Sequence, residues 1–129
     1  MATRLSPQDL VDESVRVLIS GREILLAEKL RLATNPWTRL RGLLGTAQLE
    51  WDEGLLIRPC ASVHTFFMRY PIDLVFLAKD GEVVGLRESV VPWRITPYFP
   101  ALCTLELAAG RIKATALELG ERVVFEALE

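Results

Sequence analysis

Residues 64–77 read His-Thr-Phe-Phe-Met-Arg-Tyr-Pro-Ile-Asp-Leu-Val-Phe-Leu and form the most informative stretch of the chain. They place the only histidine, His64, together with Arg69 and Asp73 inside an almost unbroken run of apolar and aromatic side chains. Burying polar or charged groups in such a run costs free energy unless they find partners. We therefore expect these three residues either to satisfy one another or the backbone, or to line a binding pocket.

Strand-like segments extend outward from this stretch in both directions. Pro71 divides the stretch itself into two strands, residues 63–70 and 74–77. Aromatic side chains fall on both faces of the first of these, which indicates a central strand covered on both sides. The segment 23–32 also has good helix formers, so a helix remains an alternative there. Further strands are predicted at residues 14–19, 24–32, 54–57, 82–86, 103–107 and 123–125, and short helices near Ser6-Pro7 and at 37–44 and 111–117.

The composition is that of one globular domain. The chain has 129 residues, of which 50% are apolar and 25% are charged, and it is long enough to bury a hydrophobic core. Together with the strand pattern, this predicts an α+β, mainly β fold. We expect a single compact antiparallel β-barrel or sandwich-like domain over residues 1–129, with two or three short helices.

Charge and hydropathy exclude several classes of function. The formal net charge is −2 with both signs interspersed, so no electrostatic footprint for nucleic acid is present. No window approaches the roughly 20 apolar residues of a transmembrane segment. The N-terminus lacks the apolar core of a secretory signal, which predicts a cytoplasmic protein. Cys60 and Cys103 are then two reduced thiols; if a removed signal peptide preceded Met1, the protein is envelope-associated and they can form a disulfide.

Cys60, His64 and Met68 follow a Cys-x3-His-x3-Met spacing of soft ligands that suggests a copper or zinc site. Four residues of strand span about 13 Å, whereas a metal needs its ligand atoms within about 2–2.3 Å. A strand therefore cannot bring the three together. We expect neither a metal nor a cofactor.

A Cys–His nucleophilic pair is the minimum of a small enzyme. Cys60 lies between Pro59 and Ala61, with no helix N-terminus to lower its pKa, and Cys103 lies among apolar neighbours typical of an inert buried thiol. The chain also has no nucleophile elbow, phosphate loop or dinucleotide motif. An enzyme using His64 with Asp73 or Cys60 as base or nucleophile pair remains the alternative hypothesis.

Two further residues are candidates for binding. Trp93 lies in a stretch with three prolines, residues 91–101, where it forms either the aromatic wall of a site or part of a small core under the loop. Glu106 lies between Leu105 and Leu107 and so points to the face opposite both. It either faces solvent or meets an arginine, Arg69 or Arg94.

An ordered series of short motifs runs through the chain. The motifs are Arg41-Gly42-Leu43-Leu44-Gly45, Gly54-Leu55-Leu56-Ile57, His64-Thr65-Phe66-Phe67-Met68-Arg69, Pro71-Ile72-Asp73, Phe76-Leu77, Asp80-Gly81, Pro92-Trp93, Leu105-Glu106-Leu107 and Ala109-Gly110. In this series the chain resembles the bacterial and archaeal proteins of domain-of-unknown-function family 192, also called uncharacterised protein family 0127. The resemblance covers about residues 15–125. It implies a compact, mainly β fold with short helices and names no established activity, substrate or cofactor.

The leading hypothesis is a non-enzymatic binding module. Its pocket or groove is lined by His64, Arg69, Asp73, Trp93 and Glu106 and takes a small polar or anionic ligand, or a protein segment. Arg69 is the expected charge partner, His64 the hydrogen-bonding group and Trp93 the apolar wall, with Asp73 orienting His64 or Arg69. A structural or assembly partner, which has an exposed apolar patch in place of a pocket, is the third alternative.

Overall fold

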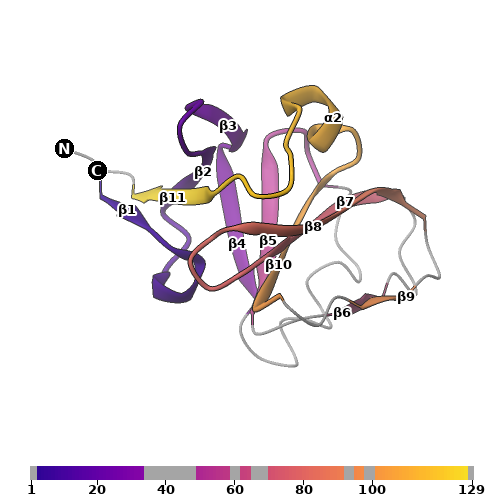
Figure 1. The fold of residues 1–129 in the computed structure, drawn as a ribbon, viewed down its shortest axis with the longest axis horizontal. Coiled ribbons are helices and arrows are strands. Elements are labelled where there is room, and N and C mark those ends of the chain that lie inside the picture. Colours follow the sequence, from indigo (N-terminus) through magenta and orange to yellow (C-terminus); the bar gives the residue numbers. More distant parts are fainter. Residues whose placement is uncertain are drawn as a thin grey trace.

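Two β-sheets packed face to face carry the fold (Figure 1). The structure is a computed structural model that describes residues 3–33, 49–58, 70–91 and 101–127, and the backbone of residues 62–64 and 95–97. The predicted mainly β, sandwich-like fold is confirmed. The barrel alternative is wrong for these residues, because their strands form separate sheets that do not close on themselves.

The first sheet has the strand order β1-β11-β2-β3, and its described pairs are all antiparallel. Strand β2 (Val15–Ile19) lies where the alternation predicts a strand, with Val15, Val17 and Ile19 at most 2% exposed. The other strands are β1 (Arg4–Leu5), β3 (Ile24–Ala27) and β11 (Val123–Ala127). Strand β11 lies between β1 and β2, so segments far apart in the sequence form one sheet.

The second sheet has the order β4-β5-β10-β7-β8, with β10 at its centre. The prediction of an antiparallel domain is wrong for one pair: β4 and β5 pair in parallel, whereas the other described pairs of this sheet are antiparallel. The strands are β4 (Lys29–Ala33), β5 (Glu53–Ile57), β7 (Ile72–Leu77), β8 (Val83–Val90) and β10 (Cys103–Ala108). All residues of β7 and β10 are buried, as expected of strands covered on both faces.

A separate two-stranded sheet lies at the lower right of Figure 1. It pairs β6 (Ser62–His64) with β9 (Ile95–Pro97) in antiparallel fashion, so that His64 is opposite Ile95. The prediction of a strand at the start of residues 63–70 is confirmed up to His64. Residues 65–69 lie outside the described part of the chain.

The segment predicted as one strand, residues 24–32, is two strands in different sheets. The chain passes from the first sheet to the second at Glu28, between β3 and β4. The amides of Glu28 and Lys29 both donate to the carbonyl oxygen of Asp52, at 2.8 and 3.1 Å, which holds the crossing in place. The helical alternative is wrong too: Leu26 and Leu30 enter the same core from opposite sheets, and this burial outweighs local helix propensity.

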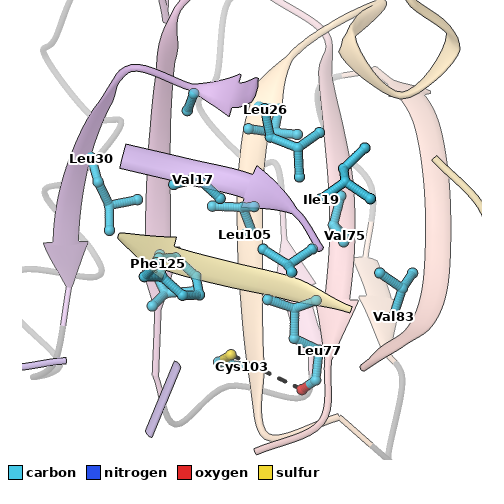
Figure 2. Packing of buried hydrophobic residues seen from close by; sticks show 14 of the residues in the cluster. Val17, Ile19, Leu26, Leu30, Val75, Leu77, Val83, Cys103, Leu105 and Phe125 are labelled. Carbon is cyan, nitrogen blue, oxygen red and sulfur yellow. Dashed lines mark hydrogen bonds between the residues drawn. The ribbon is translucent and has the colours of Figure 1, made fainter. Parts of the chain in front are cut away.

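One hydrophobic core fills the space between the two sheets (Figure 2). Val17 and Phe125 of the first sheet pack toward Leu105 of the second, and all three are 0% exposed. Cys103 belongs to the same cluster, with its Sγ 4.0 Å from the carbonyl oxygen of Leu77. Burying each large apolar side chain stabilises the fold by about 1.5–3 kcal/mol. The core therefore fixes which face of each strand of the second sheet points inward.

Short helices lie at the margins of the sheets. The described residues contain one α-helix, α2 (Arg111–Thr115), and one 3-10 helix, η1 (Pro7–Asp9). Both lie where short helices are predicted, although α2 ends before Leu117. The third predicted helix, residues 37–44, lies outside the described residues, so the expected two or three helices are not confirmed in full.

Candidate functional site

The candidate site lies on the face of the second sheet that points away from the core between the sheets. Side chains alternate along a strand, so Leu105 and Leu107 enter that core and Glu106 points to the opposite face. We call this opposite face the distal face. Its buried members are Leu55 and Ile57 of β5, Thr104, Glu106 and Ala108 of β10, and Ile72, Leu74 and Phe76 of β7.

Apolar side chains flank Glu106 on both sides of the distal face. One cluster, on the β4 and β5 side, is Ala33, Leu55 and Ile57. The other, on the β7 side, contains Leu49, Ile72, Leu74, Phe76 and Ala101. In the register of the sheet, Glu106 lies opposite Leu55 on one neighbouring strand and Leu74 on the other. A single carboxyl group is thus inserted between two apolar clusters.

Glu106 is almost completely withdrawn from solvent. It is 1% exposed, and within the described part of the chain its Oε2 atom has no hydrogen-bond partner. Removal from water disfavours the charged form, and this burial raises the pKa of Glu106 to about 8, although the positive charge of Arg31 acts in the opposite direction. The carboxyl group is therefore mostly protonated and neutral at pH 7.

Arg31 is the described cation whose charge acts on this carboxyl group. Across the sheet, Arg31 of β4 lies opposite Leu55 of β5, which in turn lies opposite Glu106 of β10. We call such a line of paired residues, running across the strands, a register row. Two strand spacings, about 10 Å, separate the two backbones, a distance that a long arginine side chain partly crosses. The Nε atom of Arg31 is buried and has no hydrogen-bond partner among the described residues. One row of the distal face therefore holds two buried polar atoms with unused hydrogen-bonding capacity.

Asp73 lies on the other face of the same sheet. It is opposite Leu107, and its carboxylate is 0% exposed. Oδ1 accepts the amide of Ser89 at 2.8 Å, while Oδ2 accepts the amides of Gly110 at 3.1 Å and Ile112 at 2.8 Å. Asp73 thus ties the end of β8 to the start of α2. The structure does not bring it together with Glu106, and its role toward His64 or Arg69 stays a prediction.

The other predicted site residues lie where the structure gives little or no side-chain description. His64 is placed by its backbone alone, at the end of β6. Arg69, Trp93 and Cys60 lie outside the described residues, so their part in a site stays a prediction. The redox state predicted for the two cysteines likewise stays a prediction.

The structure corrects one interpretation of Glu106 and adds a residue. The alternation correctly places Glu106 opposite Leu105 and Leu107, but the expectation that it faces solvent is wrong, because β10 is a central strand with both faces covered. Arg31 was not predicted as a site residue. The alternation around it indicates a strand with one wet face, and the sequence carries no signal that this face meets the row of Glu106.

The described residues form neither a metal-binding cluster nor a membrane-spanning helix. Across the described ranges, no three His, Cys, Asp or Glu side chains gather in a way that could hold a metal ion. The described helices are also too short and too polar to cross a bilayer. The predicted cytoplasmic location stays a prediction.

Comparison with known proteins identifies the family. A family model described as "Uncharacterized ACR" (DUF192) matches residues 17–125, so the chain belongs to this uncharacterised family. A UPF0127 protein of Pyrococcus furiosus is 44% identical over 107 residues, which are 80% of this chain and 90% of the relative. A UPF0127 protein of Thermococcus sibiricus is 31% identical over 106 residues, which are 78% of this chain and 68% of the relative. The family expected from the sequence motifs is confirmed.

Two solved structures share the fold. One, from Sinorhizobium meliloti, is described only provisionally as a transcription regulator; it is 28% identical, has a TM-score of 0.75, and the match covers 88% of this chain and 95% of that one. The other, a protein of unknown function from Novosphingobium aromaticivorans, is 20% identical with a TM-score of 0.74, and the match covers 92% of this chain and 96% of that one. The second likeness concerns the fold alone.

Proposed function

We propose that this protein is a binding module whose ligand site is the distal face of the second sheet, around Glu106. The observation that carries the proposal is the buried Oε2 atom of Glu106, which has no hydrogen-bond partner in the described residues. A buried polar group without a partner costs about 1–3 kcal/mol. Since native proteins leave few buried polar groups unsatisfied, each one calls for an explanation, and a ligand that completes the bonding is one.

Arg31 supports the same proposal independently. Its buried Nε–H is a second unused group in the row of Glu106, and the two groups are held by different strands. The apolar clusters on either side of Glu106 supply contact area for the non-polar part of a ligand. We propose that His64, Arg69 and Trp93 complete this site, as hydrogen-bonding group, charge partner and apolar wall respectively.

The alternative functions have less support. An enzyme that uses His64 with Asp73 needs an available carboxylate, whereas both oxygens of Asp73 already accept backbone amides. The Sinorhizobium meliloti structure is described provisionally as a transcription regulator. Direct contact of this chain with nucleic acid would call for a basic surface, and its net charge is −2. Binding of a small polar or anionic molecule remains the function that fits the distal face best.

A thermal-shift screen tests the proposal. The wild type is screened against anions, amines, alcohols, sugars, nucleotides and short peptides, because a ligand that binds only the folded state raises the melting temperature. Each hit is repeated with Glu106→Met and Arg31→Met, and with Arg87→Met as the control. Arg87 lies in the same register row, opposite Leu74, but it is exposed and donates to the carbonyl of Leu86 at 2.8 Å.

The two possible results separate clearly. The proposal expects a hit whose shift is lost in the Glu106 and Arg31 variants and is kept in the Arg87 variant. Hits that remain unchanged in folded Glu106→Met would contradict it and move the site elsewhere. A parallel comparison with Arg69→Ala and Trp93→Ala then tests the proposed remainder of the site.

A further inference from the structure

We infer that the ligand of the distal face is a small organic carboxylate, held by hydrogen bonds from both Arg31 and Glu106. This inference rests on the proposed function and names the chemical class of the ligand. It starts from the two unused groups, the buried Nε of Arg31 and the buried Oε2 of Glu106. A guanidinium N–H can only donate, so the partner of Arg31 must offer an acceptor.

The charges in the row favour a negative partner. An arginine is always positively charged in a protein, whereas burial raises the pKa of Glu106 to about 8 and leaves it mostly neutral near pH 7. The row of Arg31 and Glu106 therefore has a net positive charge that Glu106 does not balance. A carboxylate can accept a hydrogen bond from Arg31 Nε–H and another from the protonated carboxyl of Glu106. An ammonium ion would instead meet the like charge of Arg31.

The surroundings favour an organic anion over an inorganic one. Leu55 and Leu74 lie on either side of Glu106, each within its own apolar cluster. A phosphate or sulfate ion would lose part of its hydration shell next to these side chains, and it has no apolar part whose burial would offset that cost. A carboxylate with a short aliphatic or aromatic body can place its charged end in the row and its body on the apolar clusters.

The other described charges on the distal face do not replace Arg31. By alternation, Lys29 and Glu53 lie at the β4 and β5 ends of this face, and β7 contributes only apolar residues to it. Lys29 forms an ion pair with Asp52, with 3.9 Å between Nζ and Oδ2. The carboxylate of Glu53 accepts a hydrogen bond from the amide of Glu50 at 2.8 Å. The side chain of Arg87 on β8 is exposed. Arg31 is the one described cation whose charge acts on the Glu106 carboxyl.

Carboxylate binding has a characteristic dependence on pH. The bound anion favours the protonated form of Glu106, so ionisation of Glu106 opposes binding. The association constant should be constant between about pH 6.5 and 7.5 and should fall about tenfold per pH unit above about pH 8. Above that pH each ligand takes up close to one proton as it binds.

Isothermal titration with butyrate and benzoate, in two buffers of different ionisation enthalpy, measures both affinity and proton uptake. n-Butanol and n-butylammonium serve as matched neutral and cationic probes. We expect the carboxylates to bind and the two controls to bind at least tenfold more weakly. Arg31→Met should lower carboxylate affinity at least tenfold. Glu106→Gln, whose amide still donates, should keep binding near pH 7 and lose the pH dependence.

Several results would overturn the inference. Preferential binding of n-butylammonium, or a carboxylate affinity that rises with pH, would identify a cation site; the proposed binding module would survive if Glu106→Met abolished that binding. Failure of both carboxylates to bind at about 10 mM, a concentration that detects a Kd near 1 mM, would also exclude this ligand class. If no probe of any class binds in a way that depends on Glu106, both this inference and the proposed binding function fail. Because Glu106→Gln replaces a neutral protonated carboxyl with a neutral amide of similar size, it should fold even if Arg31→Met does not.

Discussion

The main chains of Gly81 and Val123 lie so close together that no side chain fits at residue 81. The amide of Val123 donates to the carbonyl of Gly81 at 2.9 Å, and a Cβ added to Gly81 would lie 2.3 Å from the carbonyl oxygen of Val123. Gly81 also has φ of 94°, a conformation that costs other residues about 1–2 kcal/mol. This contact joins the turn between β7 and β8 to the first sheet.

Gly81→Ala should therefore lower the free energy of unfolding by more than about 2 kcal/mol, because backbone strain and a main-chain clash add. Gly21→Ala is the matched control: its φ is 89°, but a Cβ there would meet nothing within 4 Å. The free energy of unfolding of Gly21→Ala should be lower than that of the wild type by only about 1 kcal/mol. Urea denaturation of both variants measures the difference, and equal losses would mean that the Val123 contact relaxes freely.

Asp73→Ala should destabilise the protein by about 3 kcal/mol or more. The substitution removes the acceptor of three backbone amides, those of Ser89, Gly110 and Ile112, and a buried donor without a partner costs about 1–3 kcal/mol. Denaturation and amide hydrogen exchange at these three positions provide the measurement. Asp80→Ala, which removes an exposed turn carboxylate, should cost less than half as much. A larger loss in Asp80→Ala would contradict a structural role for Asp73.

Stability should fall with pH because of Glu106. An unfolded chain releases this proton near pH 4.5, whereas burial holds the folded pKa at about 8. The stabilising contribution of the proton is fully present below about pH 4.5 and is lost as pH rises to about 8. The free energy of unfolding then falls by up to about 1.4 kcal/mol per pH unit over this range. The comparison is with Glu106→Gln, whose side chain does not titrate.

Urea denaturation of wild type and Glu106→Gln at pH 5, 6, 7, 8 and 9 isolates this contribution as the difference between the two proteins. The free energy of unfolding of Glu106→Gln should rise relative to that of the wild type up to about pH 8, and above that pH the difference between the two should stay constant. A difference that stays constant with pH would mean that Glu106 is ionised in the folded protein throughout.

Arg58→Met should loosen the N-terminal segment while leaving the sheets intact. The guanidinium of Arg58 donates to the carbonyl of Pro7, the first residue of η1, and to the carbonyl of Leu10, the residue that follows its last turn. Without these bonds, hydrogen exchange at the amide of Asp9, which donates to Ser6 at 3.1 Å, should speed up at least tenfold. Exchange at β10 amides should not change; an equal increase there would indicate global destabilisation instead.

Local sequence patterns predicted much of the fold because they depend on neighbours along the chain. The alternation of Val15, Val17 and Ile19 specifies both a strand and its buried face. Asp80 and Gly81 are residue types that favour turns, and they lie in the turn between β7 and β8. These features require no knowledge of which strands pair.

The remaining features depend on pairing between distant segments, which one sequence does not encode in a readable way. Glu28 looks like any strand residue, and its position between two sheets follows from the core that Leu26 and Leu30 share. The burial of Glu106 follows from the central place of β10, and its relation to Arg31 follows from the register through Leu55. Alternation specifies the face of a residue but not what covers that face.

The position of β11 between β1 and β2 has a consequence for the synthesis of the protein. The N-terminal strands leave the ribosome first, yet β1 has no neighbour in its sheet until residues 123–127 arrive. Strands β5 and β7 likewise meet only through β10, at residues 103–108. The pairs β2–β3, β4–β5 and β7–β8 can form earlier in synthesis, because neither strand of each pair depends on β10 or β11. Each of the two large sheets is therefore joined into one unit only after a late strand, β10 or β11, has been synthesised.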